Sequence, residues 1–275
     1  MSELDRIKPH RWALARVLRY APGLLMIRRV RDMLSRGLEV FENSLAHRIA
    51  PDQKIAGGPF SGMTYPVRNL GTSMILPKLL GTYEEELHPI IAVILQQPYS
   101  DVIDIGCGEG YYAIGLARGI AGTHVHAFDV DPAALSATRS LATLNGVSER
   151  VTVTEGCSAL QLRQLKTGPR LLVVSDCEGA ELDLLHPRQL PDSASIDLLI
   201  ECHECRQDTS ISDELRRRFE DSHQAQVVTS RKRDPLQYPQ LVDWTSGERE
   251  MALSESRPPE MRWLSLTQRQ GPALA

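Results

Sequence analysis

The sequence has few aromatic residues, few cysteines and no long apolar run, and neither sign of charge dominates. Phe, Trp and Tyr make up 5% of its 275 residues, and 31 Lys and Arg stand against 35 Asp and Glu. A net charge of −4 gives no global attraction to nucleic acid or to an anionic membrane. Five cysteines in a chain of this length exclude a disulfide-stapled miniprotein. The remaining composition, with 42% hydrophobic residues, is that of a globular protein with a sizeable core.

The sequence also shows no pattern typical of a membrane-spanning helix or a signal peptide. No stretch approaches the roughly 18 apolar residues that a membrane-spanning helix needs. Arg11, Arg16 and Arg19 interrupt the apolar segment that a signal peptide would require. Cys202 and Cys205 form a C-x-x-C, but no second ligand pair accompanies them as a structural zinc site would require. We therefore expect a cytoplasmic protein.

The basic residues concentrate near the N-terminus. Residues 1–50 carry ten Lys and Arg against five Asp and Glu, a local charge of +5. Apolar spacing predicts two short helices, over residues 12–20 and 24–34, separated by Ala21-Pro22-Gly23. Such helices could face RNA or a membrane surface, but we favour a helical collar packed on the main domain. We expect a basic helical extension over residues 1–56, a Gly/Pro-rich connection over 57–80 and a main domain over 81–272.

Short apolar runs alternate with helical segments beyond residue 100. We expect strands over residues 101–105, 124–128, 151–154, 170–175 and 196–201, and helices over 110–120, 132–144, 159–165 and 180–185. This alternation is typical of an α/β fold with a parallel sheet between two layers of helices. Before it, Thr82 and Glu85 suggest a capping box for a helix over residues 82–95, in which Pro89 must make a kink or separate a first turn.

The C-terminal part has a different pattern. Residues 213–219 are helical in spacing, and residues 224–230 and 261–267 resemble strands. The 30 residues between these strands are polar and rich in proline. We expect a terminal antiparallel hairpin with a long inserted loop, over about residues 231–260.

A glycine-rich turn is the clearest sign of a ligand-binding site in the sequence. The first strand ends in Asp104-Ile-Gly-Cys-Gly-Glu-Gly110, and a helix follows at once. Glycines allow a tight turn and close approach to a ligand, and the helix start offers unpaired N–H groups. Asp129, at the end of the next strand, is placed to accept the ribose hydroxyls of a nucleoside. Because Asp104 and Glu109 would repel a pyrophosphate, they favour a cofactor that is cationic near the loop.

This combination resembles the class I S-adenosylmethionine-dependent methyltransferases. The turn is similar to their first motif, and Ala127-Phe-Asp-Val-Asp-Pro132 is similar to their second. Ser175-Asp-Cys-Glu-Gly-Ala-Glu181 and Leu198-Leu-Ile-Glu-Cys-His203 resemble the D-x-E-G-x-E and E-x-H signatures of the FkbM-like branch. The resemblance covers about residues 80–270. It implies a Rossmann-like, mostly parallel seven-stranded sheet that ends in an antiparallel hairpin.

The resemblance also implies the residues that bind S-adenosylmethionine and its product S-adenosylhomocysteine. Asp104, Gly106 and Gly108 would hold the methionine end, and Asp129 would bind the ribose. Cys157 takes the usual place of an acid that binds adenine, so Ser158 or a backbone carbonyl could replace it. From their place just before the main domain, Tyr83 and Glu84 could close over the cofactor as lid residues, or they could simply start a helix. The full set of expected cofactor contacts is Tyr83, Asp104, Gly106, Cys107, Gly108, Gly110, Tyr111, Asp129, Val130, Cys157, Ser158 and Asp176.

Two pairs of polar residues follow the fourth and fifth expected strands. Asp176 and Glu178 follow one, and Glu201 and His203 end the other, so all four should meet at the carboxyl edge of the sheet. His203 is our candidate general base, with Glu178 second. The same side chains could instead hold a divalent ion, or Asp176 and Glu178 could cap the next helix, and we assign no metal ligand.

The predicted function is methylation of an oxygen of a small molecule, such as a sugar or secondary metabolite. Two alternatives remain open: an RNA or protein methyltransferase that docks through the basic N-terminal segment, and a non-catalytic protein that binds the cofactor. The sequence lacks the N/D-P-P-Y type motif of amino-directed nucleic-acid methylation, so a nucleic-acid partner is less favoured.

Overall fold

A computed structural model describes residues 28–66, 74–204, 210–255 and 261–269, and the side chains of residues 28–36 are not described. Within these ranges, no helix combines the length and the apolarity that crossing a membrane demands. The helix expected over 12–20 and residues 24–27 of the one expected over 24–34 lie outside the described residues, whereas residues 28–34 are helical. The described chain begins with α2 (Arg28–Ile49), which continues 15 residues beyond the end expected for the second helix.

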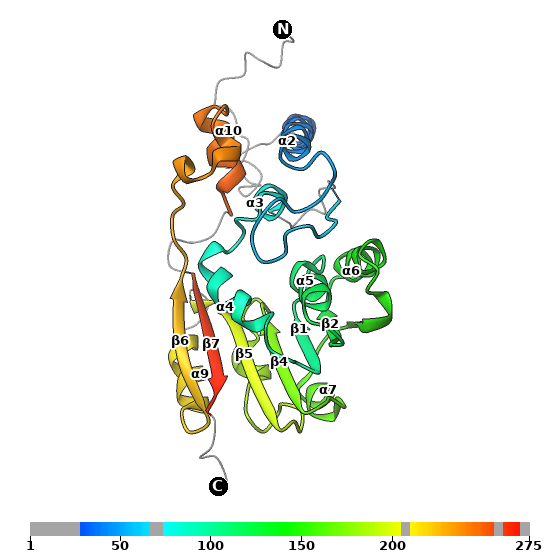
Figure 1. Cartoon of the computed structure of the whole chain (residues 1–275), viewed down its shortest axis with the longest axis vertical. Helices are drawn as coiled ribbons and strands as arrows, with labels where there is room; N and C mark the ends of the chain where they lie inside the picture. The colour runs from blue at the N-terminus through cyan, green and yellow to red at the C-terminus, as the bar shows by residue number, and fades with distance from the viewer. Residues whose placement is uncertain (1–27, 67–73, 205–209, 256–260, 270–275) are drawn as a thin grey trace.

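Seven strands form one sheet with the order β3-β2-β1-β4-β5-β7-β6. The first five in this order pair in parallel, and β7 lies antiparallel between β5 and β6. The predicted fold is thus confirmed, including the terminal antiparallel hairpin (Figure 1). The strands are β1 (Asp101–Ile105), β2 (His124–Asp129), β3 (Val151–Glu155), β4 (Arg170–Ser175), β5 (Ser195–Cys202), β6 (His223–Thr229) and β7 (Arg262–Gln268).

Helices cover both faces of the sheet, and the strand side chains alternate between them. Val102 and Val174 face the layer that contains α4 (His88–Ile94), α5 (Tyr111–Gly119) and α6 (Pro132–Leu144). Ile103 and Val173 face the layer that contains α7 (Ala159–Gln164), α8 (Glu181–Leu184) and α9 (Ile211–Phe219). Strands that are apolar on both faces are what a doubly covered parallel sheet requires.

The expected capping box at Thr82 is wrong. Gly81 ends α3 (Ile75–Leu80) in the left-handed conformation, and Glu84 is left-handed again at φ 49°, so the chain turns twice where a helix start was expected. Glu85 begins a short 3₁₀ turn, η2 (Glu85–Leu87), and its side chain accepts a hydrogen bond from Tyr238 at 2.6 Å. The α-helix starts only at His88, with Pro89 in its first turn, so proline separates the first turn from the rest.

The long connection between β6 and β7 is more structured than expected. It contains two 3₁₀ turns, η5 (Pro235–Gln237) and η6 (Pro239–Leu241), and the helix α10 (Ser246–Leu253). A further 3₁₀ turn, η3 (Ser148–Arg150), precedes β3. A capping box between Thr245 and Glu248 starts α10. Arg48 of α2 contacts Glu248 at 2.6 Å, so the connection packs against the N-terminal helices at one end of the molecule (Figure 1). The domain boundaries at 56 and 80 stay a prediction.

Candidate active site

A cavity of about 410 Å³ lies over the carboxyl ends of β1, β2 and β4. The strand order reverses between β1 and β4, which is where ligands bind in open α/β sheets. Of the predicted cofactor contacts, the cavity lining includes Tyr83, Asp104, Gly106, Cys107, Gly108, Tyr111, Asp129, Val130, Cys157 and Asp176. Lys78, Tyr112, Phe128, Asp131 and Cys177 line it too, although we had not predicted them as contacts.

The glycine turn is tied tightly to its neighbours. The backbone N–H groups of Gly106 and Cys107 donate to the carbonyl of Phe128 at 2.8 and 2.9 Å, which joins the turn to the end of β2. Gly106 has φ 80°, and a Cβ there would lie 1.8 Å from the carbonyl oxygen of Asp176. Any side chain at this position would therefore push the ends of β1 and β4 apart. Gly110, the N-cap of α5, is not among the lining residues.

Asp104 is a buried residue of the cavity lining, and part of its carboxyl group is unsatisfied. Its side chain Oδ2 has no hydrogen-bond partner among the described residues, and the residue is 3% exposed. Burial, and then the nearby carboxylate of Asp176, raise the pKa of Asp104 to about 8. A buried carboxyl in this condition is stabilised as an anion by a positive ligand. This fits the ammonium and sulfonium of S-adenosylmethionine.

Glu109, the second acid of the turn, already has a positive partner. Its carboxylate forms a buried ion pair with Lys78 of α3 and accepts a hydrogen bond from Tyr65. Burial alone would raise the pKa of Glu109, but Lys78 and Tyr65 lower it. We expected Asp104 and Glu109 to attract a cationic ligand together, but the charge of Glu109 is balanced by Lys78, which leaves Asp104 for this role.

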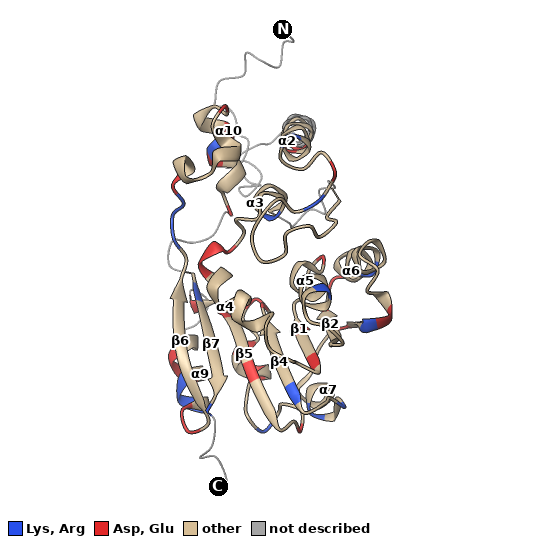
Figure 2. Cartoon of the chain, viewed as in Figure 1, with Lys and Arg blue, Asp and Glu red and all other residues tan. Residues whose placement is uncertain are grey.

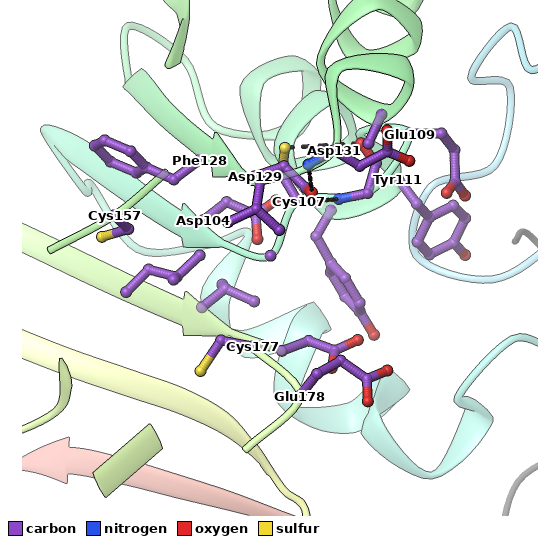
Figure 3. A pocket seen from close by; sticks show the side chains of 18 of the residues that line it. Asp104, Cys107, Glu109, Tyr111, Phe128, Asp129, Asp131, Cys157, Cys177 and Glu178 are labelled. Carbon is purple, nitrogen blue, oxygen red and sulfur yellow. Dashed lines mark hydrogen bonds between the residues drawn. The ribbon is translucent and has the colours of Figure 1, made fainter. Parts of the chain in front are cut away.

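Asp129 is held in one orientation at the end of β2. Its Oδ2 accepts from the N–H of Gly108 at 2.8 Å, and its Oδ1 accepts from the N–H of Asp131 at 2.9 Å. The fixed carboxylate retains further lone pairs that could accept ribose hydroxyls. Figure 3 shows Phe128 and Cys157 beyond Asp129 on one side, with Glu109 and Tyr111 on the other. The cavity thus has an apolar end and a charged, aromatic end.

Ser158, a predicted cofactor contact, caps a helix and does not line the cavity. Its hydroxyl accepts from the N–H of Gln161 at 3.2 Å and caps α7, in a capping box with the Gln161 side chain. It is absent from the lining of the cavity, whereas Cys157 is present. Burial raises the pKa of the Cys157 thiol, so it remains neutral and suits an uncharged base better than a cation.

His203 lies against the carboxylates that follow β4. Its Nε2 lies 3.5 Å from Asp176 Oδ1 and 3.7 Å from Glu178 Oε2, and its Nδ1 lies 2.5 Å from Glu181 Oε1. Burial would lower the pKa of His203, but Glu181, Asp176 and Glu178 outweigh it and raise the pKa above 6.5. Figure 3 shows Glu178 on the β4 side of the cavity. His203 is therefore a stronger base than free imidazole, and it is oriented by Glu181.

Glu201 does not join this group. Glu201 lies within β5, opposite Trp263 of β7. It is buried and does not line the cavity. The other three expected residues do meet, because Asp176 and Glu178 follow the end of β4, with Glu178 at φ 56°, and His203 follows the end of β5. Glu181, in the D-x-E-G-x-E segment, is the acid that His203 contacts instead.

Asp176, Glu178 and His203 could also hold a divalent cation. One ligand atom from each lies within 4.8 Å of the others. Carboxylate oxygens and imidazole nitrogen are suitable donors for such an ion. The other metal candidate, the C-x-x-C pair, has Cys202 buried in the core and Cys205 outside the described residues.

Arg233, in the connection after β6, fixes the segment that bears Tyr83. Its guanidinium lies 3.1 Å from Glu86 and 2.6 Å from Glu255, and its Nε donates to the carbonyl of Thr82 at 3.0 Å. Figure 2 shows the basic stretch after β6 beside the acidic stretch that precedes α4. Glu84 accepts from Tyr112 and does not line the cavity, so only Tyr83 of the two expected lid residues reaches it.

Comparison with known proteins gives a match over a segment that supplies part of the cavity lining. Residues 86–175 match the family model of ribosomal protein L11 methyltransferase (PrmA). The ribosomal protein L11 methyltransferase of Photorhabdus laumondii is 39% identical over 72 residues, which are 24% of this chain. The chain spans about a quarter of the length of that curated relative, 24%.

Solved structures with a similar fold include three methyltransferases. Geranyl diphosphate C-methyltransferase from Streptomyces coelicolor, solved with S-adenosylhomocysteine, has a TM-score of 0.46 and 14% identity over 82% of this chain and 97% of its own. The O-methyltransferase of Bacillus cereus has a TM-score of 0.41 and 14% identity, with 94% and 100% covered. TomG of Streptomyces achromogenes has 0.43 and 14%, with 95% and 99% covered. The matched segment, residues 86–175, runs from η2 to the end of β4 and contains the glycine turn, Asp104 and Asp129.

Proposed function

We propose that this chain is a methyltransferase that uses S-adenosylmethionine and that the cavity is its cofactor site. The observation that carries the proposal is the buried, partly unsatisfied carboxyl of Asp104 beneath a glycine turn, at the reversal point of the sheet. The match of residues 86–175 to a methyltransferase family model supports it. Bound S-adenosylmethionine supplies a methyl group that its sulfonium already activates.

The chain's own residues position and enclose the cofactor. Asp104 and the backbone of the glycine turn hold the amino-acid end, and the fixed carboxylate of Asp129 binds the ribose. Phe128 and Cys157 provide an apolar place for the adenine. Methyl transfer is an in-line displacement, so alignment and exclusion of water are the main contributions of the protein.

We propose an oxygen of a small molecule, such as a sugar or secondary metabolite, as the methyl acceptor. His203 takes the hydroxyl proton on Nε2, and Glu181 at Nδ1 stabilises the imidazolium that forms. Asp176 and Glu178 flank Nε2 and orient the acceptor. The D-x-E-G-x-E and E-x-H segments that supply these residues support membership of the FkbM-like branch.

A protein acceptor is the second candidate. It is favoured by the match to the ribosomal protein L11 methyltransferase family and by the +5 charge of residues 1–50. A protein acceptor bound through this basic segment would bind more weakly at high salt.

One labelling experiment separates these candidates. The protein is incubated with methyl-labelled S-adenosylmethionine and fractionated cell extract, and label is counted in small molecules, protein and RNA. We expect label in the small-molecule fraction and at least about 100-fold less with His203→Ala, the usual size of a general-base effect. Label in protein would establish the second candidate. Cofactor binding without transfer to any fraction would favour the non-catalytic alternative.

A further inference from the structure

One positive charge faces an otherwise acidic cavity. Among the lining residues, Lys78 is the only Lys or Arg, whereas six are acidic: Asp104, Glu109, Asp129, Asp131, Asp176 and Glu178. Lys78 is 6% exposed and belongs to α3, outside the segment that matches the family model. Removing an ammonium from water costs free energy, so a buried lysine requires anionic or hydrogen-bonding partners.

The described residues accept only some of the hydrogen bonds that the Lys78 ammonium can donate. It has three N–H donors, and Glu109 takes one of them. Its other described contacts are the faces of two aromatic rings, at 4.6 Å from the centre of Tyr83 and 5.3 Å from that of Tyr111. These rings shape the surroundings of the ammonium without accepting a conventional hydrogen bond. Donors therefore remain for an anionic oxygen at the cavity surface.

The backbone around Lys78 is fixed, so the ammonium is presented in a defined place. All six residues of α3 are buried, and the N–H of Ala56 donates to the carbonyl of Leu79 at 2.8 Å. Gly81 packs against Gly57 so closely that a Cβ there would lie 2.2 Å from the Gly57 carbonyl. The segment before the methyltransferase-like region thus completes the wall of the cavity.

Lys78 lies at the end of the cavity where an amino acid would sit. Its partners Glu109 and Tyr111 are at the opposite end from Phe128 and Cys157, with Asp129 between them (Figure 3). If the nucleoside occupies the apolar end, the methionine part of the cofactor points toward Lys78. That part is a zwitterion, which offers an ammonium to Asp104 and a carboxylate to a cation.

We propose that Lys78 binds the α-carboxylate of the cofactor's methionine part and so makes the site selective for a ligand that has this carboxylate. The inference rests on the proposed function. It assigns to α3, which precedes the segment that matches the family model, a direct contribution to cofactor binding. Glu109 then serves to hold Lys78 in position when the ligand is absent.

The test compares two ligands that differ only in the carboxylate: S-adenosylmethionine and decarboxylated S-adenosylmethionine, which keeps the sulfonium and an amine. Lys78→Met alone would leave Glu109 buried without its partner, so the informative pair is Glu109→Gln and Lys78→Met/Glu109→Gln. Dissociation constants are measured by calorimetry for the full chain. Lys54→Met, at an exposed position outside the cavity lining, is the control for the substitution.

We expect the wild type, Glu109→Gln and Lys54→Met to bind S-adenosylmethionine at least about 10-fold more tightly than the decarboxylated form. In Lys78→Met/Glu109→Gln this preference should vanish, through loss of S-adenosylmethionine affinity with the decarboxylated ligand changed by less than about 3-fold. A preference that survives in the double variant, or an equal loss for both ligands, would overturn the role of Lys78 and leave the proposed function intact. Failure of the wild type to bind either ligand would overturn both.

Discussion

Replacing Asp104 by Asn is expected to weaken S-adenosylmethionine binding by about 30- to 5,000-fold and to stabilise the ligand-free protein above pH 8. The loss of affinity follows because a buried charge pair is worth about 2–5 kcal/mol when one partner is removed. The asparagine side chain keeps the shape of the aspartate but cannot neutralise an ammonium or a sulfonium. Calorimetric titration measures the affinity.

The gain in stability comes from the same carboxyl group. Because the pKa of Asp104 is raised to about 8 in the folded protein, the folded state binds more protons than the unfolded state between about pH 4 and 8. The free energy of unfolding therefore falls as the pH rises through this window. At pH 9 we expect the melting temperature of the variant to exceed that of the wild type by about 2–4 °C for each kcal/mol gained in the free energy of unfolding. At pH 4 the difference should be small.

Asp192→Asn serves as the control, because Asp192 is an exposed carboxylate outside the cavity. It should change neither the affinity nor the melting temperature. If Asp104→Asn bound the cofactor as tightly as the wild type, the assignment of the cofactor site would fail. If it were less stable than the wild type at pH 9, the carboxyl would have a structural partner that our account lacks.

Replacing His203 by Ala is expected to lower kcat by about 10²- to 10⁴-fold while changing S-adenosylmethionine affinity by less than about 3-fold. His203 contacts Asp176 and Glu178 but is absent from the cavity lining, so it should act on the acceptor and not on the cofactor. The measurement is steady-state turnover on the acceptor that the labelling experiment identifies. His47→Ala, at an exposed position on α2, is the control.

The pH profile gives a second, independent readout of His203. The carboxylates of Glu181, Asp176 and Glu178 raise the pKa of His203, and a base must lose its proton before it can act. Turnover should therefore rise with pH through a midpoint above 6.5. Glu181→Gln removes the hydrogen-bonded acid and should move this midpoint to lower pH. A profile that stays unchanged in both Glu181→Gln and His203→Ala would remove His203 from the mechanism.

Local patterns were sufficient to predict the sheet and the glycine turn. The strands β1, β4 and β5 are short apolar runs because they are buried on both faces, and all of β1 to β5 were predicted to within about two residues. β3, at the edge of the sheet, is only partly buried. Asp104 and Asp129 follow directly from the ends of two such strands. Even α10 had a local signal, the Thr245 and Glu248 capping box, which the surrounding prolines obscured.

Contacts between distant segments were not predictable in this way. Lys78 and Glu109 are 31 residues apart, and nothing in either local sequence indicates that they pair. His203 contacts Glu181 and not the expected Glu201 for a similar reason. The position of Glu181 depends on how the chain turns after β4, where Glu178 is left-handed, and the apolar pattern of a strand does not predict the path of the chain beyond its end.

The central claim is that a cation binds in this cavity and ionises Asp104. It is tested most directly by calorimetric titration of the wild type with S-adenosylmethionine at pH 7, in two buffers of different ionisation enthalpy. Because burial raises the pKa of Asp104 to about 8, its carboxyl is mainly protonated in the ligand-free protein at this pH. The account predicts binding with release of a proton. Binding without proton release, or no binding, would contradict it.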